Sequence, residues 1–172
     1  ARRAGLRAKA VMTVVGDLED RASIVRIAGL ADAVLHFAPP QDNGIHDTRT
    51  VNLLSVLSQN MLPKRLVYIS TSGVYGDCGG AWVNETHPLN ATSSRAQRRA
   101  DAEKQIRNWA RRNRVNASIL RVPGIYAADR LPLSRLQKGT PGIVDSEDNY
   151  TNHIQADDLA RICVAALQRG KA

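Results

Sequence analysis

The feature that most constrains this fold is a run of eleven residues, Leu66 to Gly76, with the sequence L-V-Y-I-S-T-S-G-V-Y-G. Its first half is apolar and rich in β-branched and aromatic residues, which is typical of a strand buried in a parallel sheet. The run then changes at once to hydroxyl residues and a glycine. Ligands of open α/β sheets bind at the carboxyl ends of the strands. We therefore expect Ser70, Thr71 and Ser72 to face a binding site.

Strand and helix patterns alternate along the whole chain. Such alternation predicts an α/β fold, a doubly wound, Rossmann-type parallel sheet with right-handed helical crossovers. The predicted strands cover residues 11–15, 33–37, 66–70, 117–122 and 150–154. The predicted helices cover residues 20–28, 47–61 and 157–168, with one more beginning at Ser94.

Local signals predict where the helices begin and end. Gly29 is expected to end the first helix, and Pro63 to close the second, whose apolar stripe ends at Met61. Ser94 followed by Gln97 has the pattern of a capping box at the start of the third helix. That helix carries an apolar stripe of four residues, Ala102, Ile106, Trp109 and Ala110.

Composition predicts one globular domain over residues 1–172, because 43% of the residues are hydrophobic and no low-complexity tract interrupts them. We expect a cytoplasmic protein, since no apolar run is long enough to span a membrane and the N-terminal sequence lacks the apolar core of a signal peptide. The two cysteines, Cys78 and Cys163, lack metal-ligand spacing. We therefore expect reduced thiols and no metal site.

The chain is basic, with 24 Lys and Arg residues against 16 Asp and Glu residues and a net charge of +8. The densest cluster lies on the helix that begins at Ser94 and comprises Arg95, Arg98, Arg99, Lys104, Arg107, Arg111, Arg112 and Arg114. A basic helix can track the phosphates of a nucleic acid. However, only 4% of the residues are aromatic, so few side chains could stack on bases. We favour a solvated helix face and expect no nucleic-acid partner.

Five segments, in this order, resemble motifs of the NAD-dependent epimerase/dehydratase family, the extended short-chain dehydrogenase/reductases. They are V-G-D-L at 15–18, H-F-A-P-P at 36–40, the run at 66–76, L-R-V-P-G-I-Y at 120–126 and H-I-Q-A-D-D-L-A at 153–160. The resemblance extends over nearly the whole chain. It implies NAD or NADP as cofactor, oxidoreductase or isomerase chemistry, and a nucleotide sugar or another small carbonyl compound as substrate. It is compatible with a homodimer and implies no membrane partner.

The resemblance also assigns cofactor-binding residues. Asp17 and Leu18 would contact the adenine, although Asp17 could instead cap the helix that follows. Ala38 and Pro39 lie in the turn that would face the ribose and pyrophosphate, where two consecutive prolines remove amide donors. The remaining assigned positions are the strand-end Ser70 and the loop along the nicotinamide, Pro123, Gly124 and Ile125. His153, Asp157 and Asp158 match a motif near the substrate, but the same residues fit a strand end and a helix N-terminus.

One departure from the family concerns the cofactor. The family begins with a strand, a Gly-x-Gly-x-x-Gly turn and a helix, then a second strand, whereas this sequence contains no such turn. We read the chain as a fragment without the first two strands and the C-terminal lobe. Their loss would leave a hole on the order of 14 Å between the first and second strands of this chain. We therefore expect residues 1–172 alone to bind a dinucleotide poorly.

A second departure concerns the catalytic Tyr-x-x-x-Lys pair of the family. Alignment on Glu103 places Arg95 at the tyrosine position and Arg99 at the lysine position. Arginine does not deprotonate, so it cannot replace the phenol as acid or base. Thr71 matches the family residue that bonds the reacting oxygen. If catalysis persists, Tyr75 or Tyr126 must supply a phenol, and the simpler alternative is that both tyrosines pack at the sheet edge.

Three functions therefore follow from the resemblance. The first is an epimerase/dehydratase-like enzyme with a degenerate catalytic pair. The second is a non-catalytic protein that binds or senses a dinucleotide, and the third is an RNA-binding relative of the same superfamily.

Overall fold

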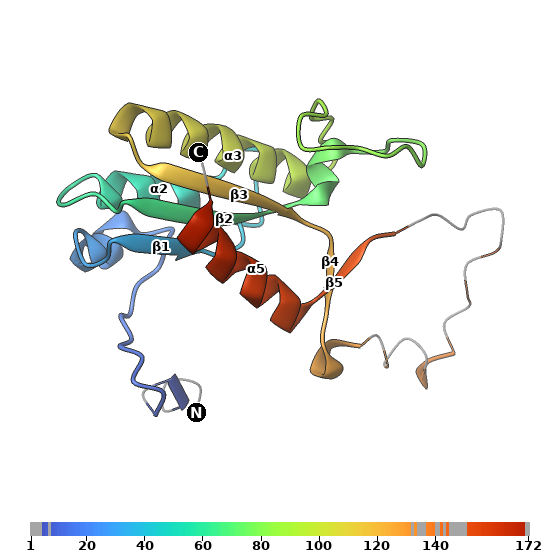
Figure 1. Ribbon diagram of the computed structural model, residues 1–172, viewed down its shortest axis with the longest axis horizontal. Coiled ribbons are helices and arrows are strands. Elements are labelled where there is room, and N and C mark those ends of the chain that lie inside the picture. Colours follow the sequence, from blue (N-terminus) through green and yellow to red (C-terminus); the bar gives the residue numbers. More distant parts are fainter. Residues whose placement is uncertain are drawn as a thin grey trace.

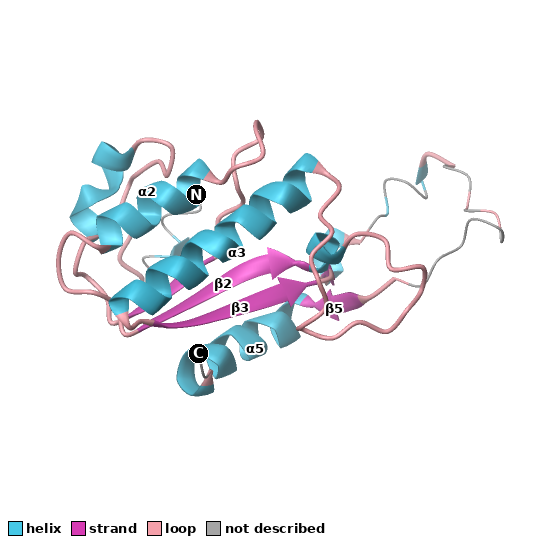
Figure 2. Ribbon diagram, turned by 90° about the horizontal axis from the view of Figure 1, so that it is seen from above, coloured by secondary structure: helices cyan, strands magenta, loops and turns pink. Residues whose placement is uncertain are grey.

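A computed structural model of the chain describes residues 5–6, 8–131 and 151–170, together with positions 133, 137–139, 142 and 144. Its main sheet has three parallel strands in the order β1 (Ala33–His36), β2 (Arg65–Thr71) and β3 (Asn116–Val122). The helices α2 (Thr48–Leu57) and α3 (Ser94–Asn113) cover one face, and α5 (Ala156–Arg169) covers the other (Figures 1 and 2). This confirms the predicted α/β class with a parallel sheet.

The main core lies between the sheet and the helices α2 and α3. The predicted apolar stripe of α3 is buried in this core. Ile106 is fully buried, and Trp109 donates from Nε1 to the Ser58 hydroxyl at 2.8 Å. Its buried members are Leu53, Leu54, Leu57, Leu66, Tyr68, Ala102, Ile106, Trp109, Ala110 and Val115. A smaller cluster on the opposite face joins Val122 to Leu159 and Cys163 of α5. Both faces of β2 are thus covered, as its apolar sequence predicts.

Two helix boundaries differ from the prediction. α3 is capped by Ser93, whose hydroxyl accepts from Ala96 N at 3.2 Å, so Ser94 is the first helical residue and not the cap. α2 ends at Leu57, well before Pro63, because the Ser58 hydroxyl bonds back to the Leu54 carbonyl at 2.8 Å where the helix stops. Met61 lies beyond that end and is 69% exposed, so it does not belong to the buried stripe.

The predicted strand at residues 11–15 does not form, and Met12 and Val15 are 84% and 60% exposed. A strand is stable only when a neighbour completes its backbone hydrogen bonds. None of the described segments lies beside residues 11–15 as a strand partner. The next segment behaves as expected, because Asp20 caps the short 3-10 helix η1 (Arg21–Ile27), which packs against α2, and Gly29 follows its end with a φ of +73°.

A second, two-stranded parallel sheet pairs β4 (Gly124–Tyr126) with β5 (His153–Gln155). The sequence analysis placed residues 123–125 in a loop and so missed β4, because the partner strand of β4 lies far along the chain. β5 overlaps the predicted strand at 150–154 at His153 and Ile154 and extends to Gln155, whereas the first predicted residue, Tyr150, lies outside the described residues. The α5 helix follows directly, capped by the Gln155 side chain, which accepts from the backbone N–H groups of Asp157 and Asp158. In the described part of the chain, none of the helices has the length and apolarity needed to cross a membrane.

Candidate functional site

The carboxyl ends of the three parallel strands meet at one edge of the main sheet, and most of the predicted site residues lie there (Figure 2). They form two groups. One surrounds the ends of β2 and β3, and the other surrounds the end of β1.

Thr71 is the last residue of β2 and pairs with Val122 of β3. Its hydroxyl accepts from Gly73 N at 3.2 Å and thereby caps the 3-10 helix η2 (Ser72–Tyr75). A hydroxyl that accepts this bond still has a proton to donate. The neighbouring Ser70 hydroxyl is buried and helps to lower the pKa of the Glu103 carboxyl. Two hydroxyls therefore lie at the end of the central strand.

The strand register brings the predicted nicotinamide loop next to these hydroxyls. Because Thr71 pairs with Val122, the following Pro123, Gly124 and Ile125 continue beside the end of β2. A side chain at Gly124 would not fit, since its Cβ would lie 2.6 Å from the His153 ring. His153 therefore packs against the backbone of this loop, in agreement with its strand-end interpretation.

Arg99 does not point to the position expected of a catalytic lysine. It is buried on α3, and its guanidinium donates to the Tyr68 hydroxyl at 3.0 Å and to the Ile69 carbonyl at 2.6 Å. Burial raises the pKa of Tyr68 to about 12 although Arg99 opposes this shift. Arg95, one turn earlier, is exposed. The Arg99 charge is thus committed to Tyr68 and to the Ile69 carbonyl near the end of β2, whereas Arg95 is open to solvent.

Tyr75 is buried and is held by Arg121 of β3. The Arg121 guanidinium bonds to the Tyr75 hydroxyl at 2.9 Å and lies 4.8 Å from the centre of its ring. The same guanidinium donates to Glu103 of α3 at 2.8 Å and to the Glu85 carbonyl at 3.0 Å. The other candidate phenol, Tyr126, lies on β4 and is 44% exposed. Only one of the two phenols therefore has its hydroxyl engaged by a guanidinium in the described structure.

Glu103 is the charged centre of this network. Burial raises the pKa of this carboxyl, but hydrogen bonds from Arg121, Ser70 and Arg107 outweigh burial and hold the pKa below its ordinary value. The Glu103 side chain is 1% exposed, so it remains a buried carboxylate between two guanidinium groups. Removal of either side of such a pair leaves an uncompensated charge.

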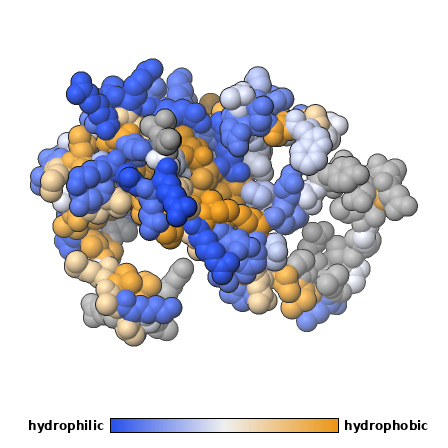
Figure 3. Space-filling view, viewed as in Figure 1, coloured by the Kyte–Doolittle hydropathy of each residue, from blue (hydrophilic) through white to orange (hydrophobic). Residues whose placement is uncertain are grey.

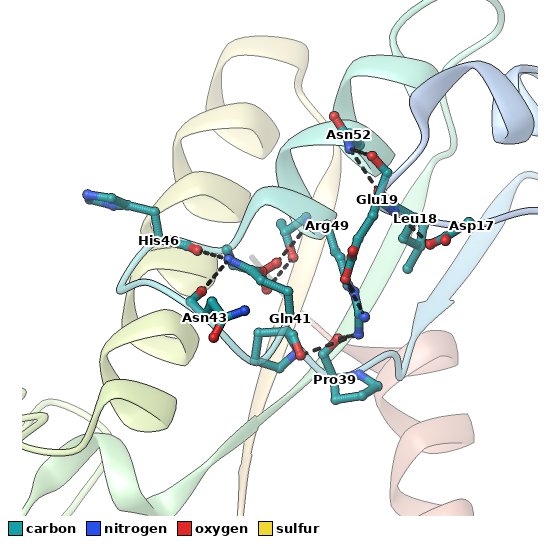
Figure 4. A network of polar contacts seen from close by, with 12 residues as sticks. Asp17, Leu18, Glu19, Pro39, Gln41, Asn43, His46, Arg49 and Asn52 are labelled. Atoms are coloured by element: carbon teal, nitrogen blue, oxygen red, sulfur yellow. Dashed lines mark hydrogen bonds and ion pairs between the residues drawn. The ribbon is translucent and has the colours of Figure 1, made fainter.

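A turn at residues 17–19 forms the first half of the group around β1. Asp17 Oδ1 accepts from Glu19 N at 2.9 Å, and Asp17 N donates to the Ser23 hydroxyl at 2.8 Å. Asp20, and not Asp17, caps η1, so the alternative role of Asp17 as the cap is wrong. The Leu18 carbonyl accepts from Asn52 of α2 at 2.8 Å (Figure 4).

Arg49 of α2 links this turn to the predicted ribose and pyrophosphate turn. Its Nε donates to Glu19 at 3.0 Å and its Nη1 to the Pro39 carbonyl at 3.1 Å (Figure 4). Ala38, between β1 and Pro39, is half-buried. Arg49 therefore fixes two segments that the sequence assigned independently to the same cofactor.

The sequence interpretation missed the roles of Arg49, Asn52 and Arg121. Arg49 and Asn52 are three residues apart on α2, which places both on one helix face. Arg121 is a single charge inside an apolar strand, and an unpaired charge there would be costly, so the pattern itself indicated a buried partner.

A hollow of about 1100 Å³ follows the outer edge of β3, away from the β1 group. Its apolar wall is formed by β3 and by Ile154, Leu159 and Ile162, with Tyr75 and Arg121 at one end. Figure 3 shows the corresponding hydrophobic surface over β3, beneath the hydrophilic surface of α3.

The basic cluster on α3 is not one free surface. Arg98 and Arg99 are buried, and Arg98 donates to the Gly44 carbonyl at 2.6 Å. Arg107 pairs with Glu103 at 2.9 Å. These contacts support the interpretation of α3 as a structural helix with a solvated outer face.

Comparison with known proteins agrees with this arrangement. The dTDP-glucose 4,6-dehydratase of Mycolicibacterium smegmatis is 30% identical over 145 residues, which cover 76% of this chain and 42% of that protein. The chain thus spans less than half the length of this relative. A double mutant of DesIV, the dTDP-glucose 4,6-dehydratase of Streptomyces venezuelae, was solved with NAD bound and matches with a TM-score of 0.83 at 24% identity, over 98% of this chain and 58% of that one. RMD of Pseudomonas aeruginosa, solved with NADPH, matches with a TM-score of 0.78 at 19% identity, over 94% of this chain and 65% of that one.

The two structural matches show the Rossmann-type fold. The model of the NAD dependent epimerase/dehydratase family matches residues 1–172, from the first residue to the last. This chain therefore belongs to the NAD dependent epimerase/dehydratase family.

Proposed function

We propose that this protein binds NAD or NADP and converts a nucleotide sugar, or another small carbonyl compound, by hydride transfer at the end of β2. The observation that carries the proposal is the Thr71 hydroxyl, which caps η2 and lies next to the loop that begins at Pro123. The relatives named dTDP-glucose 4,6-dehydratase and the neighbours solved with NAD or NADPH support this substrate class and cofactor.

The residues at the strand ends fit a dinucleotide in part. The Thr71 hydroxyl keeps a proton to donate, and the loop backbone at Gly124 carries no side chain, although the His153 ring already packs against it. Asp17 keeps acceptor capacity, because its Oδ1 receives a single bond, from Glu19 N, in the described structure. Pro39 and Pro40 offer no amide to a pyrophosphate. The adenine and nicotinamide ends are therefore better provided with contacts than the pyrophosphate.

In this proposal Asp17 and Leu18 would hold the adenine, Ala38 and Pro39 the ribose and pyrophosphate, and Ser70 with residues 123–125 the nicotinamide. When bound, the nicotinamide supplies the group that accepts and returns the hydride. Thr71 donates a hydrogen bond to the reacting oxygen. Arg99 acts indirectly, because its bonds to Tyr68 and the Ile69 carbonyl fix the strand that presents Thr71.

Of the two phenols, Tyr126 is the better candidate for moving a proton. Its side chain is exposed on β4, just beyond Gly124, whereas the Tyr75 hydroxyl is occupied by Arg121. A positioned acid or base contributes a factor of about 10² to 10⁴ to a rate. Replacing Tyr126 by Phe should therefore cost this factor in kcat, and replacing Tyr75 by Phe should mainly lower stability.

A second candidate is a protein that binds the dinucleotide without catalysis. The hydrogen bond from Arg99 to the Ile69 carbonyl favours this second candidate. Arg99 stands at the lysine position of the family, and its guanidinium is used by the strand and not by a substrate oxygen.

Calorimetry with NADH and NADPH tests cofactor binding on two versions of the protein, residues 1–172 and the same residues joined to the first two strands and the glycine turn of a family relative. We expect saturable binding by the extended version and none by residues 1–172. Micromolar binding by residues 1–172 alone would contradict the fragment interpretation. An extended version that binds neither dinucleotide would refute the proposed function.

Assays of sugar-nucleotide turnover then separate the two candidates. Turnover that falls in Thr71→Ala and Tyr126→Phe supports the enzyme, and cofactor binding without turnover supports the second candidate. Turnover that survives Thr71→Ala, Tyr75→Phe and Tyr126→Phe would show that the reaction takes place elsewhere.

A further inference from the structure

The loop at residues 76–91, the green loop at the upper right of Figure 1, is closed at its base. Asn90 N donates to the Val74 carbonyl at 3.0 Å. Gly76 has a φ of +72°, and a Cβ there would lie 2.3 Å from the Asn90 carbonyl oxygen. Only glycine fits both the conformation and the space. The two ends of the loop are therefore held together, and residues far apart within it are brought face to face.

Two turns inside the loop orient Cys78 and His87 toward each other. The first turn is fixed by Asp77, whose carboxylate accepts from Gly79 N at 2.8 Å. The second is fixed by Asn84, whose carbonyl accepts from His87 N at 3.1 Å. As a result, Cys78 Sγ lies 3.9 Å from His87 Nε2 although nine residues separate them, and it also lies 3.8 Å from the Tyr75 carbonyl and 4.0 Å from the Gly76 carbonyl.

The His87 ring is itself supported. It lies edge-on against Tyr75, with ring centroids 6.0 Å apart, and Tyr75 is held in turn by Arg121. The charged groups around this part of the loop are the Arg121 guanidinium with its partner, the Glu103 carboxylate, and the carboxylates of Asp77 and Glu85 within the loop itself. The exposed imidazole is thus supported on one side by Tyr75, and its Nε2 lies near the thiol.

The two cysteines of the chain differ in access. Cys78 is half-buried and reachable from solvent, and Cys163 is buried in the core beneath α5 with 2% exposure. Burial also raises the pKa of Cys163. A thiol reagent should therefore react at Cys78, and the buried Cys163 of the same chain serves as an internal reference.

We propose that Cys78 is a covalent modification site at which His87 accepts the thiol proton and a small electrophile, in nature a peroxide, reacts with the sulfur. The thiolate attacks one peroxide oxygen, an S–O bond forms and the O–O bond breaks. Sulfur is oxidised to a sulfenic acid, and the peroxide is reduced, its second oxygen leaving as water with the proton that His87 held. The added oxygen would separate Cys78 from His87 and disturb the packing of His87 on Tyr75.

Alkylation by iodoacetamide, followed by mass spectrometry of peptides, tests the nucleophilic pair on the 172-residue chain. We expect Cys78 to be alkylated while Cys163 stays protected. His87→Asn should lower the rate at Cys78 about tenfold, because the proton acceptor is lost. His46→Asn, an exposed histidine of another loop, is the matched control and should leave the rate unchanged.

Protection of Cys163 in each variant shows that the fold is intact, so a slow His87→Asn reaction cannot be attributed to unfolding. A second arm uses hydrogen peroxide with dimedone, which traps sulfenic acid. We expect the adduct on Cys78 and its loss in Cys78→Ser. An alkylation rate at Cys78 that is equal in wild type and His87→Asn, or a dimedone adduct confined to Cys163, would overturn the proposal.

Discussion

Lowering the pH should destabilise this protein through one buried histidine. His36 is 4% exposed at the end of β1, where its Nε2 lies 3.0 Å from the Thr50 hydroxyl and its ring packs on Tyr68 at 5.1 Å between centroids. Burial lowers the pKa of His36 to about 4, although the Asp47 carboxylate opposes this shift. The folded state therefore holds a neutral imidazole, which is costly to protonate in place.

The sign and size of the effect follow from linkage. The folded pKa lies below the unfolded value of about 6.5, so the unfolded chain binds the extra proton between these two values. The contribution to stability is complete above about pH 6.5, decreases as the pH falls, and is lost below about pH 4. The free energy of unfolding should drop by about 2 kcal/mol between about pH 7.5 and pH 5, and by about 3 kcal/mol in total.

Urea unfolding at a series of pH values measures this slope in the wild type and in His36→Gln, which cannot titrate. We expect the variant to be less stable at neutral pH and to lose most of the slope between about pH 7.5 and pH 5. Asp101 and Glu103, whose pKa values are lowered, lose their contribution at more acidic pH, which keeps the two effects apart. His153→Gln, at another exposed histidine, is the control and should keep the slope. Equal slopes in the wild type and in His36→Gln would refute the reasoning.

Three further perturbations test other parts of the structure. Glu103→Gln should lower the free energy of unfolding by about 3–5 kcal/mol in thermal or urea unfolding, because the Arg121 guanidinium loses its buried carboxylate partner. A loss below about 1 kcal/mol would contradict the role of Glu103 as the charged centre of this network. Gly124→Ala should cost about 1–3 kcal/mol through its contact with the His153 ring, and the combination with His153→Ala should recover much of this loss if the contact is the cause. RNA binding to α3, followed by fluorescence anisotropy, should be weak, indifferent to sequence and absent at about 0.15 M salt, whereas tight binding at that salt would restore the RNA-binding alternative.

The sequence predicted the parts of the fold that depend on local pattern. The apolar run at 66–70 became the central strand, and the stripe ending at Ala110 became the buried face of α3, because periodicity and burial are linked residue by residue. Elements that depend on distant partners were not predictable in this way. Residues 11–15 have the composition of a strand, but none of the described segments pairs with them, and β4 forms only because β5 returns beside it.

The same distinction applies to the candidate site. The strand-end position of Ser70 and Thr71 followed from the sequence, because a parallel sheet gathers its carboxyl ends at one edge. The direction in which a long side chain points did not follow from the sequence. Arg99 had the spacing of a catalytic residue, but its guanidinium found the buried carbonyl of Ile69, and only the packed structure shows which acceptor lies within reach.

The outer edge of β1 has a consequence for handling the protein. Among the described strands β1 pairs with β2 alone, and Leu35 and Phe37 beside its open edge are 42% and 47% exposed. An uncovered edge flanked by apolar side chains is a template on which other chains add as strands, and natural sheets protect such edges by charge, shortness or cover. Residues 1–172 should therefore self-associate when expressed alone, and a lysine at position 35 should raise their solubility without touching the core.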